Sequence, residues 1–159
     1  MKMALRGSIA VSVVALFFSL LTQSPAHAAT ITVNSTDDAG TGTLRQAILD
    51  MNSGDTIDFD PAAFSPASPA TITLASTLPT INKSLTIDGN GATLVGPGGE
   101  GDTDSLARAG VGVLIEGATG VEIKNLKVRG FANGLLARDC QALRIADCDF
   151  SDNYHNPGH

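Results

Sequence analysis

The chain has 159 residues, with 16 acidic against 10 basic side chains and a net charge of −6. This acidic balance argues against nucleic acid or an anionic membrane as a partner. The chain has no tryptophan and a single tyrosine, Tyr154. Sugar sites built on stacked aromatic rings are therefore disfavoured, because such sites need exposed aromatic faces.

The first residues have the parts of a secretory signal peptide. Lys2 and Arg6 supply positive charge, residues 9–21 form an apolar run, and residues 26–28 fit a small-x-small cleavage site. The apolar run is short for a membrane span. The sequence therefore predicts a signal peptide over residues 1–28 and no membrane span after its cleavage. The expected location is secreted or at the cell surface, with the periplasm as the alternative.

Residues 29–70 are predicted to form an N-terminal cap that contains one short helix. Thr43 and Gln46 have the spacing of a capping box, and Gly54 stands where a helix C-cap favours glycine. One helical face would be apolar, with Leu44, Ile48 and Met51. A helix of residues 44–52 ahead of all repeats would close the apolar end of the first coil as a lid. The alternative is a helix packed on the outer wall.

A repeat of 22 residues follows the cap. At this offset residues 121–130 match residues 143–152, and apolar side chains alternate as they do in strands. The inward positions of one unit are Val113, Ile115, Val121, Ile123, Leu126 and Val128. A fixed period of this kind predicts stacked coils. The predicted fold class is all-β, a right-handed parallel β-helix (β-solenoid) with a short capping helix, its coils covering residues 71–159.

A third copy of the repeat is interrupted. Residues 85–87 align with residues 121–123 at an offset of 36, which exceeds one repeat by 14 residues. Two of the extra residues belong to the turn at 88–91, and twelve to a loop rich in glycine and aspartate at 97–110. Insertions in solenoids fall on one face and often carry function.

Four segments together resemble a known family. They are Gly-Thr-Gly-Thr-Leu-Arg-Gln-Ala-Ile at 40–48, Gly-Asp-Thr-Ile-Asp-Phe at 54–59, Thr-Ile-Thr-Leu at 71–74 and Leu-Thr-Ile-Asp-Gly at 85–89. The chain resembles the N-terminal region of secreted bacterial β-helix proteins with the pectin-lyase-like fold, in which turn asparagines lie where Asn125 lies here. The resemblance implies a module that binds or processes extracellular polysaccharide, as a lyase or glycoside hydrolase if it is an enzyme. The alternative within the same fold is a structural or adhesive surface protein without an active site, since fold alone does not settle function.

Three acids on the last repeat form a predicted calcium site. They are Asp147, Asp149 and Asp152, and the resemblance implies that such carboxylates bind calcium in an external groove. Calcium takes six to eight oxygen ligands. The inserted loop offers an alternative set, Glu100, Asp102 and Asp104, in what is otherwise expected to be a flexible segment. No complete catalytic set is visible, so the catalytic and substrate-binding residues stay unassigned.

The same acids also have a structural interpretation. Asp147 takes the turn position that asparagine holds one coil earlier. Asp149 stacks over Lys127 at the repeat offset, and Arg138 stacks over Glu116. Both stacked pairs are predicted to be surface ion pairs, which contribute about 0–1 kcal/mol each and need no function.

The remaining candidates for chemistry lie near the end of the chain. Cys148 occupies an inward position, which predicts a buried thiol, and a disulfide with Cys140 is the alternative. His155 and His159 are four residues apart, but Pro157 between them prevents the helix that would align them as metal ligands. We expect a loose tail there.

The next coil would begin at Asn156, and the sequence stops at His159. A solenoid cut within a repeat exposes strand edges and an apolar end. We therefore expect that the chain is a fragment or truncated product, or that self-association covers the open end.

Overall fold

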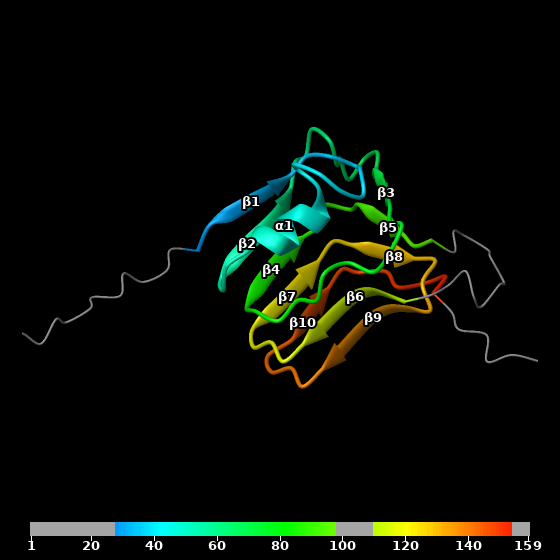
Figure 1. Cartoon of the computed structure of the whole chain (residues 1–159). Coiled ribbons are helices and arrows are strands. Elements are labelled where there is room, and N and C mark those ends of the chain that lie inside the picture. Colours follow the sequence, from blue (N-terminus) through cyan, green and yellow to red (C-terminus); the bar gives the residue numbers. More distant parts are fainter. Residues whose placement is uncertain (1–27, 98–109, 154–159) are drawn as a thin grey trace, which may run out of the picture.

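The computed structural model describes residues 28–97 and 110–153, so residues 1–27 of the predicted signal peptide lie outside it. Ten strands and one helix follow along these residues (Figure 1). They are β1 (Thr30–Val33), α1 (Leu44–Asp50), β2 (Asp55–Phe59), β3 (Thr71–Thr73), β4 (Leu85–Asp88), β5 (Thr93–Val95), β6 (Val111–Glu116), β7 (Val121–Lys124), β8 (Lys127–Arg129), β9 (Asn133–Arg138) and β10 (Arg144–Ala146). Over the described ranges, no helix has the length and apolar character needed to cross a membrane.

The strands form three parallel sheets that wind as one solenoid of about four turns. The largest sheet has the order β1-β2-β4-β7-β10, the second β3-β5-β8 and the third β6-β9. Each strand pairs with its counterpart one coil away, and Figure 1 shows the coils stacked from β1 to β10. The predicted all-β solenoid with a short N-terminal helix is confirmed.

The strand register places the extra residues where the sequence indicated. β4 pairs with β7 at an offset of 36 residues, β5 with β8 at 34, and β6 with β9 at 22. The offset falls by two across the turn after β4 and by twelve between β5 and β6. Both predicted insertions are therefore confirmed, and the longer one coincides with residues 98–109, outside the described part of the chain.

The interior of the solenoid is a single apolar cluster. All six inward positions predicted for the central unit are at most 2% exposed: Val113, Ile115, Val121, Ile123, Leu126 and Val128. The last coil is less covered, because Ile145 is 39% exposed and Cys148 and Phe150 are only partly buried. Burial therefore depends on having a coil on both sides, as expected for a stacked architecture.

The helix α1 closes the β1 end of the solenoid. Its side chains Leu44 and Ile48, and Met51 directly after it, are at most 4% exposed and belong to the core cluster. The helix packs against β1 and β2, which are the first two strands of the largest sheet. The predicted lid is confirmed.

Two details of the predicted helix ends are wrong. The Thr43 side chain accepts a hydrogen bond from the Gln46 backbone N–H at 3.2 Å, as predicted, but the Gln46 side chain donates to Asp50 at 2.8 Å instead of reaching back. The helix ends at a C-cap on Met51, and Gly54 lies in the following turn with φ +93°. The Asp50 carboxylate, one helical turn after Gln46, accepts the hydrogen bond from its amide. The turn into β2 has a positive φ at Gly54, which favours glycine there.

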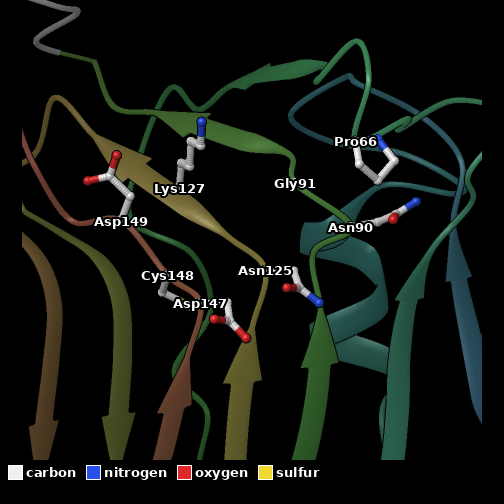
Figure 2. A pocket seen from close by; sticks show the side chains of 8 residues that line it. All are labelled: Pro66, Asn90, Gly91, Asn125, Lys127, Asp147, Cys148 and Asp149. Carbon is white, nitrogen blue, oxygen red and sulfur yellow. The ribbon is translucent and has the colours of Figure 1, made fainter.

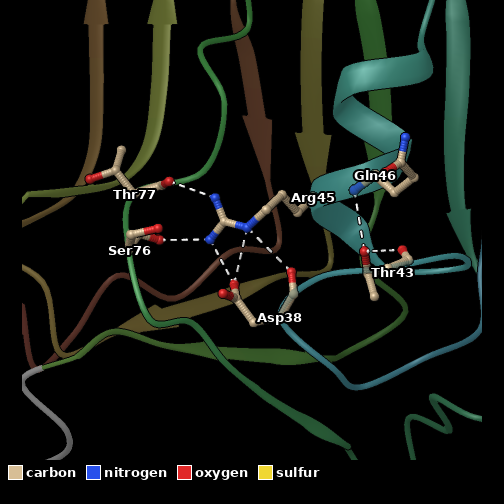
Figure 3. A network of polar contacts seen from close by, with 7 residues as sticks. Asp38, Thr43, Arg45, Gln46, Ser76 and Thr77 are labelled. Carbon is tan, nitrogen blue, oxygen red and sulfur yellow. Dashed lines mark hydrogen bonds and ion pairs between the residues drawn. The ribbon is translucent and has the colours of Figure 1, made fainter.

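Arg45 fastens the helix to the first coil, as Figure 3 shows. Its Nη2 atom lies 2.6 Å from the Asp38 carboxylate and 2.9 Å from the Ser76 carbonyl oxygen, and its Nη1 donates to the Thr77 carbonyl oxygen at 2.8 Å. The planar guanidinium thus joins the loop before α1, the helix itself and the connection after β3. A fork of fixed donors suits such a junction, because one side chain satisfies several acceptors at once.

Candidate functional site

A groove of about 340 Å³ runs along the corner where the five-stranded sheet turns into the three-stranded sheet (Figure 2). We call it the corner groove. Its lining residues come from successive coils: Pro66, Asn90, Gly91, Asn125, Lys127, Asp147, Cys148 and Asp149. Pro66 belongs to the connection from β2 to β3, and the others to the next three turns of the solenoid. The groove therefore extends along the axis of the fold.

The corner itself is built by residues in the left-handed backbone region. Asn90, Asn125 and Asp147 have φ values of 47°, 54° and 51°, one in each successive turn. Asparagine and aspartate tolerate this region better than other residues with a side chain. The prediction that Asp147 takes the place of Asn125 in its turn is confirmed. The result is one polar side chain per coil at the same corner.

The two asparagine amides are held by contacts outside the groove. Asn125 donates through Nδ2 to the Asp88 carboxylate at 2.9 Å, and Asn90 donates through Nδ2 to the Phe64 carbonyl oxygen. These bonds fix the orientation of both amides, so each side chain presents its oxygen as an acceptor in a fixed position, and Asn125 keeps a second N–H donor. Figure 2 shows the Asn125 oxygen turned to the side on which Asp147 lies. The row is thus rich in hydrogen-bond acceptors.

Asp88 supports this row from the end of β4. Burial opposes its ionisation, but hydrogen bonds from Asn125 and Lys124 outweigh burial and lower the pKa of the Asp88 carboxyl. Its other oxygen lies 3.0 Å from Lys124 Nζ, and the same contact raises the pKa of Lys124. Both groups therefore stay charged at neutral pH and hold Asn125 in one orientation.

Two charged residues, Lys127 and Asp149, line the other end of the groove. They face each other in the register of the last two coils, as predicted. The ion pair of Asp149, however, is formed with Arg129, at 3.6 Å from Nη2 to Oδ2. The predicted ion pair between Lys127 and Asp149 is therefore wrong, because Arg129, on the same strand as Lys127, forms the ion pair with Asp149. Hydrogen bonds from Ser151 and the nearby basic charges lower the pKa of Asp149.

The three predicted calcium ligands lie in two different places, two in the corner groove and one outside it. Asp147 and Asp149 line the corner groove, whereas Asp152 lies outside the lining, 3.8 Å from Arg129 Nη1. Within residues 28–97 and 110–153, no three His, Cys, Asp or Glu side chains come together as a group suited to a metal. Calcium binding stays a prediction. The alternative loop acids Glu100, Asp102 and Asp104, and the histidines His155 and His159, lie outside the described residues.

Both cysteines are free thiols. Cys140 precedes β10 and Cys148 follows it, so the strand separates them. Cys148 Sγ lies 3.2 Å from the Ala146 carbonyl oxygen, and Cys140 Sγ lies 3.0 Å from that of Arg138. Burial raises the pKa of the Cys148 thiol. Cys148 packs against the core but is only partly buried, so the predicted buried thiol is confirmed in its inward position and not in full burial, and the alternative disulfide is not formed.

Ion pairs between coils also differ from those predicted. Glu116 and Arg138 are register partners, but among the described residues no ion pair within 4.0 Å joins them. Pairs between coils form instead on the outer face of the largest sheet, where Lys124 contacts Asp88 and Arg144 contacts Glu122. Adjacent parallel strands bring such outward side chains close together, so this face carries a short ladder of opposite charges.

No protein-family model, curated protein or solved structure matches this chain. The corner groove therefore rests on its own geometry. Sequence reasoning found Asn125, Lys127, Asp147 and Asp149 but missed the part formed by Pro66, Asn90 and Gly91. The signal for Asn90 was present, because an asparagine between two glycines directly after a strand is typical of a left-handed turn position.

Proposed function

We propose that this chain is a non-catalytic module that binds a linear extracellular polysaccharide in the corner groove. The observation that carries the proposal is the direction of the groove, which crosses successive coils and offers a polar side chain at each turn. A repeating polymer laid along the axis would meet similar groups at each coil. Export and a pectin-lyase-like ancestry belong to the same proposal; export rests on the signal-peptide features of residues 1–28 and the ancestry on the sequence resemblance.

The chemistry of the lining suits sugar hydroxyl groups. Asn90 and Asn125 offer amide oxygens, Asp147 and Asp149 offer carboxylates, and Lys127 offers an ammonium group. A hydroxyl both donates and accepts, so it can pair with every one of these groups. The ring of Pro66 adds apolar surface to the lining, as small-molecule sites also contain, and Gly91 adds no side chain that would narrow the groove.

Binding is favoured over hydrolysis by the ionisation of Asp149. Glycoside hydrolysis uses one protonated carboxyl as a general acid, and its pKa is raised for that purpose. The pKa of Asp149 is lowered instead, through Ser151 and the neighbouring basic charges. A carboxylate that stays ionised and paired can accept hydrogen bonds from hydroxyls, but it is poorly suited to deliver a proton.

Affinity electrophoresis tests the proposal. The purified protein is run in native gels that contain neutral or acidic soluble polysaccharides, with Asp147→Ala combined with Lys127→Ala as the groove variant. Asp139→Ala is the matched control, because Asp139 is an exposed residue with φ 51° in the same coil but outside the lining. We expect at least one polysaccharide to retard the wild type and the control but not the groove variant. Retardation that the groove variant retains would refute the proposal.

A structural or adhesive role is the second candidate, and the charge ladder on the largest sheet favours it. The contacts of Lys124 with Asp88 and of Arg144 with Glu122 each join two coils and stiffen the stack. If this were the whole function, no polysaccharide would retard the protein. Replacing Lys124 with Gln should then lower the unfolding temperature, and each polysaccharide gel should give the variant the same mobility as a gel without polysaccharide.

A further inference from the structure

We propose that the corner groove selects an uncharged polysaccharide over one that carries a carboxylate on each sugar. The inference deepens the proposed function and rests on it. It follows from how the charges of the lining are balanced, and from which of them already have partners within the solenoid.

The acid at one position of the lining has a basic partner within the solenoid, which it shares with Asp152. Asp149 lies 3.6 Å from Arg129, and its pKa is lowered in part by that charge. Asp147, by contrast, is exposed, and among residues 28–97 and 110–153 no basic side chain lies within 4.0 Å of its carboxylate. It therefore adds a full negative charge to the groove, next in the row to the Asn125 amide.

The negative charge of Asp147 would repel a polyuronate. Such a polymer has a carboxylate on every unit, so a chain lying along the groove would bring at least one of them near Asp147. Lys127 can attract the carboxylate of another unit, whereas the unit that lies beside Asp147 meets a like charge. Like charges placed together are an effective means of rejecting a wrong partner.

An uncharged chain meets no such conflict. Its hydroxyls can donate to Asp147 and to the oxygens of Asn90 and Asn125, and can accept from Lys127. Hydrogen bonds to ionised acceptors are stronger than those between neutral groups. Asp147 is therefore a specificity residue: it accepts hydrogen bonds from sugar hydroxyls and repels sugar carboxylates.

The substitution Asp147→Asn isolates the charge from the shape. Asparagine occupies the equivalent turn position one coil earlier with φ 54°, so the variant should keep the backbone and fold normally. Asp139→Asn removes a charge from the same coil outside the groove and is the matched control. Both are compared with the wild type in low-salt affinity gels that contain hydroxyethyl cellulose, galactomannan, polygalacturonate or alginate.

We expect a neutral polymer to retard the wild type and the two uronate polymers to retard it least. Asp147→Asn should strengthen uronate binding about tenfold, the size expected for removing one close repulsion, and change neutral binding by less than about threefold. Stronger retardation of the wild type by a uronate polymer, or an Asp147→Asn variant with unchanged preference, would overturn this inference while leaving the proposed function standing. Retardation by none of the four polymers would overturn both.

Discussion

Replacing Ile123 with alanine tests the stacked core most sharply. Ile123 is fully buried in β7, between β4 on one side and β10 on the other. The change removes three buried carbon atoms, which costs about 2.4 kcal/mol at roughly 0.8 kcal/mol for each. The cavity between two coils adds to this, so we expect a loss of about 3–4 kcal/mol in the free energy of unfolding.

Ile145 provides the matched control, because it is the register partner of Ile123 one coil later. It is 39% exposed, so less transfer free energy is lost and no closed cavity remains. We expect Ile145→Ala to cost about 1 kcal/mol. Urea unfolding followed by circular dichroism measures both losses, provided that the slope of the transition is unchanged. Equal losses for the two variants would refute the stacking that the register implies.

Three further predictions concern the lid, the support of the corner groove and the thiols. Arg45→Lys should lower the free energy of unfolding by about 1–3 kcal/mol, since an ammonium cannot replace the fork that joins four acceptor atoms; an unchanged unfolding midpoint would contradict this. Because the pKa of Asp88 is lower in the folded protein than its ordinary 3.8, its contribution is present above pH 3.8 and is lost as the pH falls through the folded value. Asp88→Asn should therefore flatten the stability profile below that pH, and thermal melts of the two proteins across the acid range would show it. Alkylation of the unfolded, unreduced protein should modify both Cys140 and Cys148, and a mass that lacks both modifications would show a disulfide. In the native protein Cys148 should react more slowly than in urea, because burial raises the pKa of its thiol.

The register of the fold could be predicted because two independent features of the sequence indicate it. Apolar residues recur at the offset of one coil, and the interruption between β5 and β6 leaves a surplus that can be counted. The lid followed from its position ahead of the repeats and from the apolar face of Leu44 and Ile48. These features depend on local pattern and on burial, which a sequence displays directly.

The polar partners could not be predicted to the same degree. Register brings Lys127 opposite Asp149, but a side chain on a sheet surface also reaches diagonal neighbours, and Arg129 forms the ion pair instead. Arg45 binds the Asp38 carboxylate and also the backbone carbonyl oxygens of Ser76 and Thr77, and backbone acceptors have no sequence signature. Asn90 escaped alignment because the two extra residues in its turn shift it out of the repeat offset.

The most direct test of the corner groove is the side-chain amide signals of Asn90 and Asn125 in a nitrogen–proton correlation spectrum. Neutral oligosaccharides taken from the polymer that retards the protein are titrated into the labelled chain. If the sugar chain binds in the corner groove, these two amides and the backbone signal of Gly91 shift together and saturate with one affinity. Saturable shifts confined to residues elsewhere, with the Asn90 and Asn125 amides unmoved, would contradict binding in the corner groove.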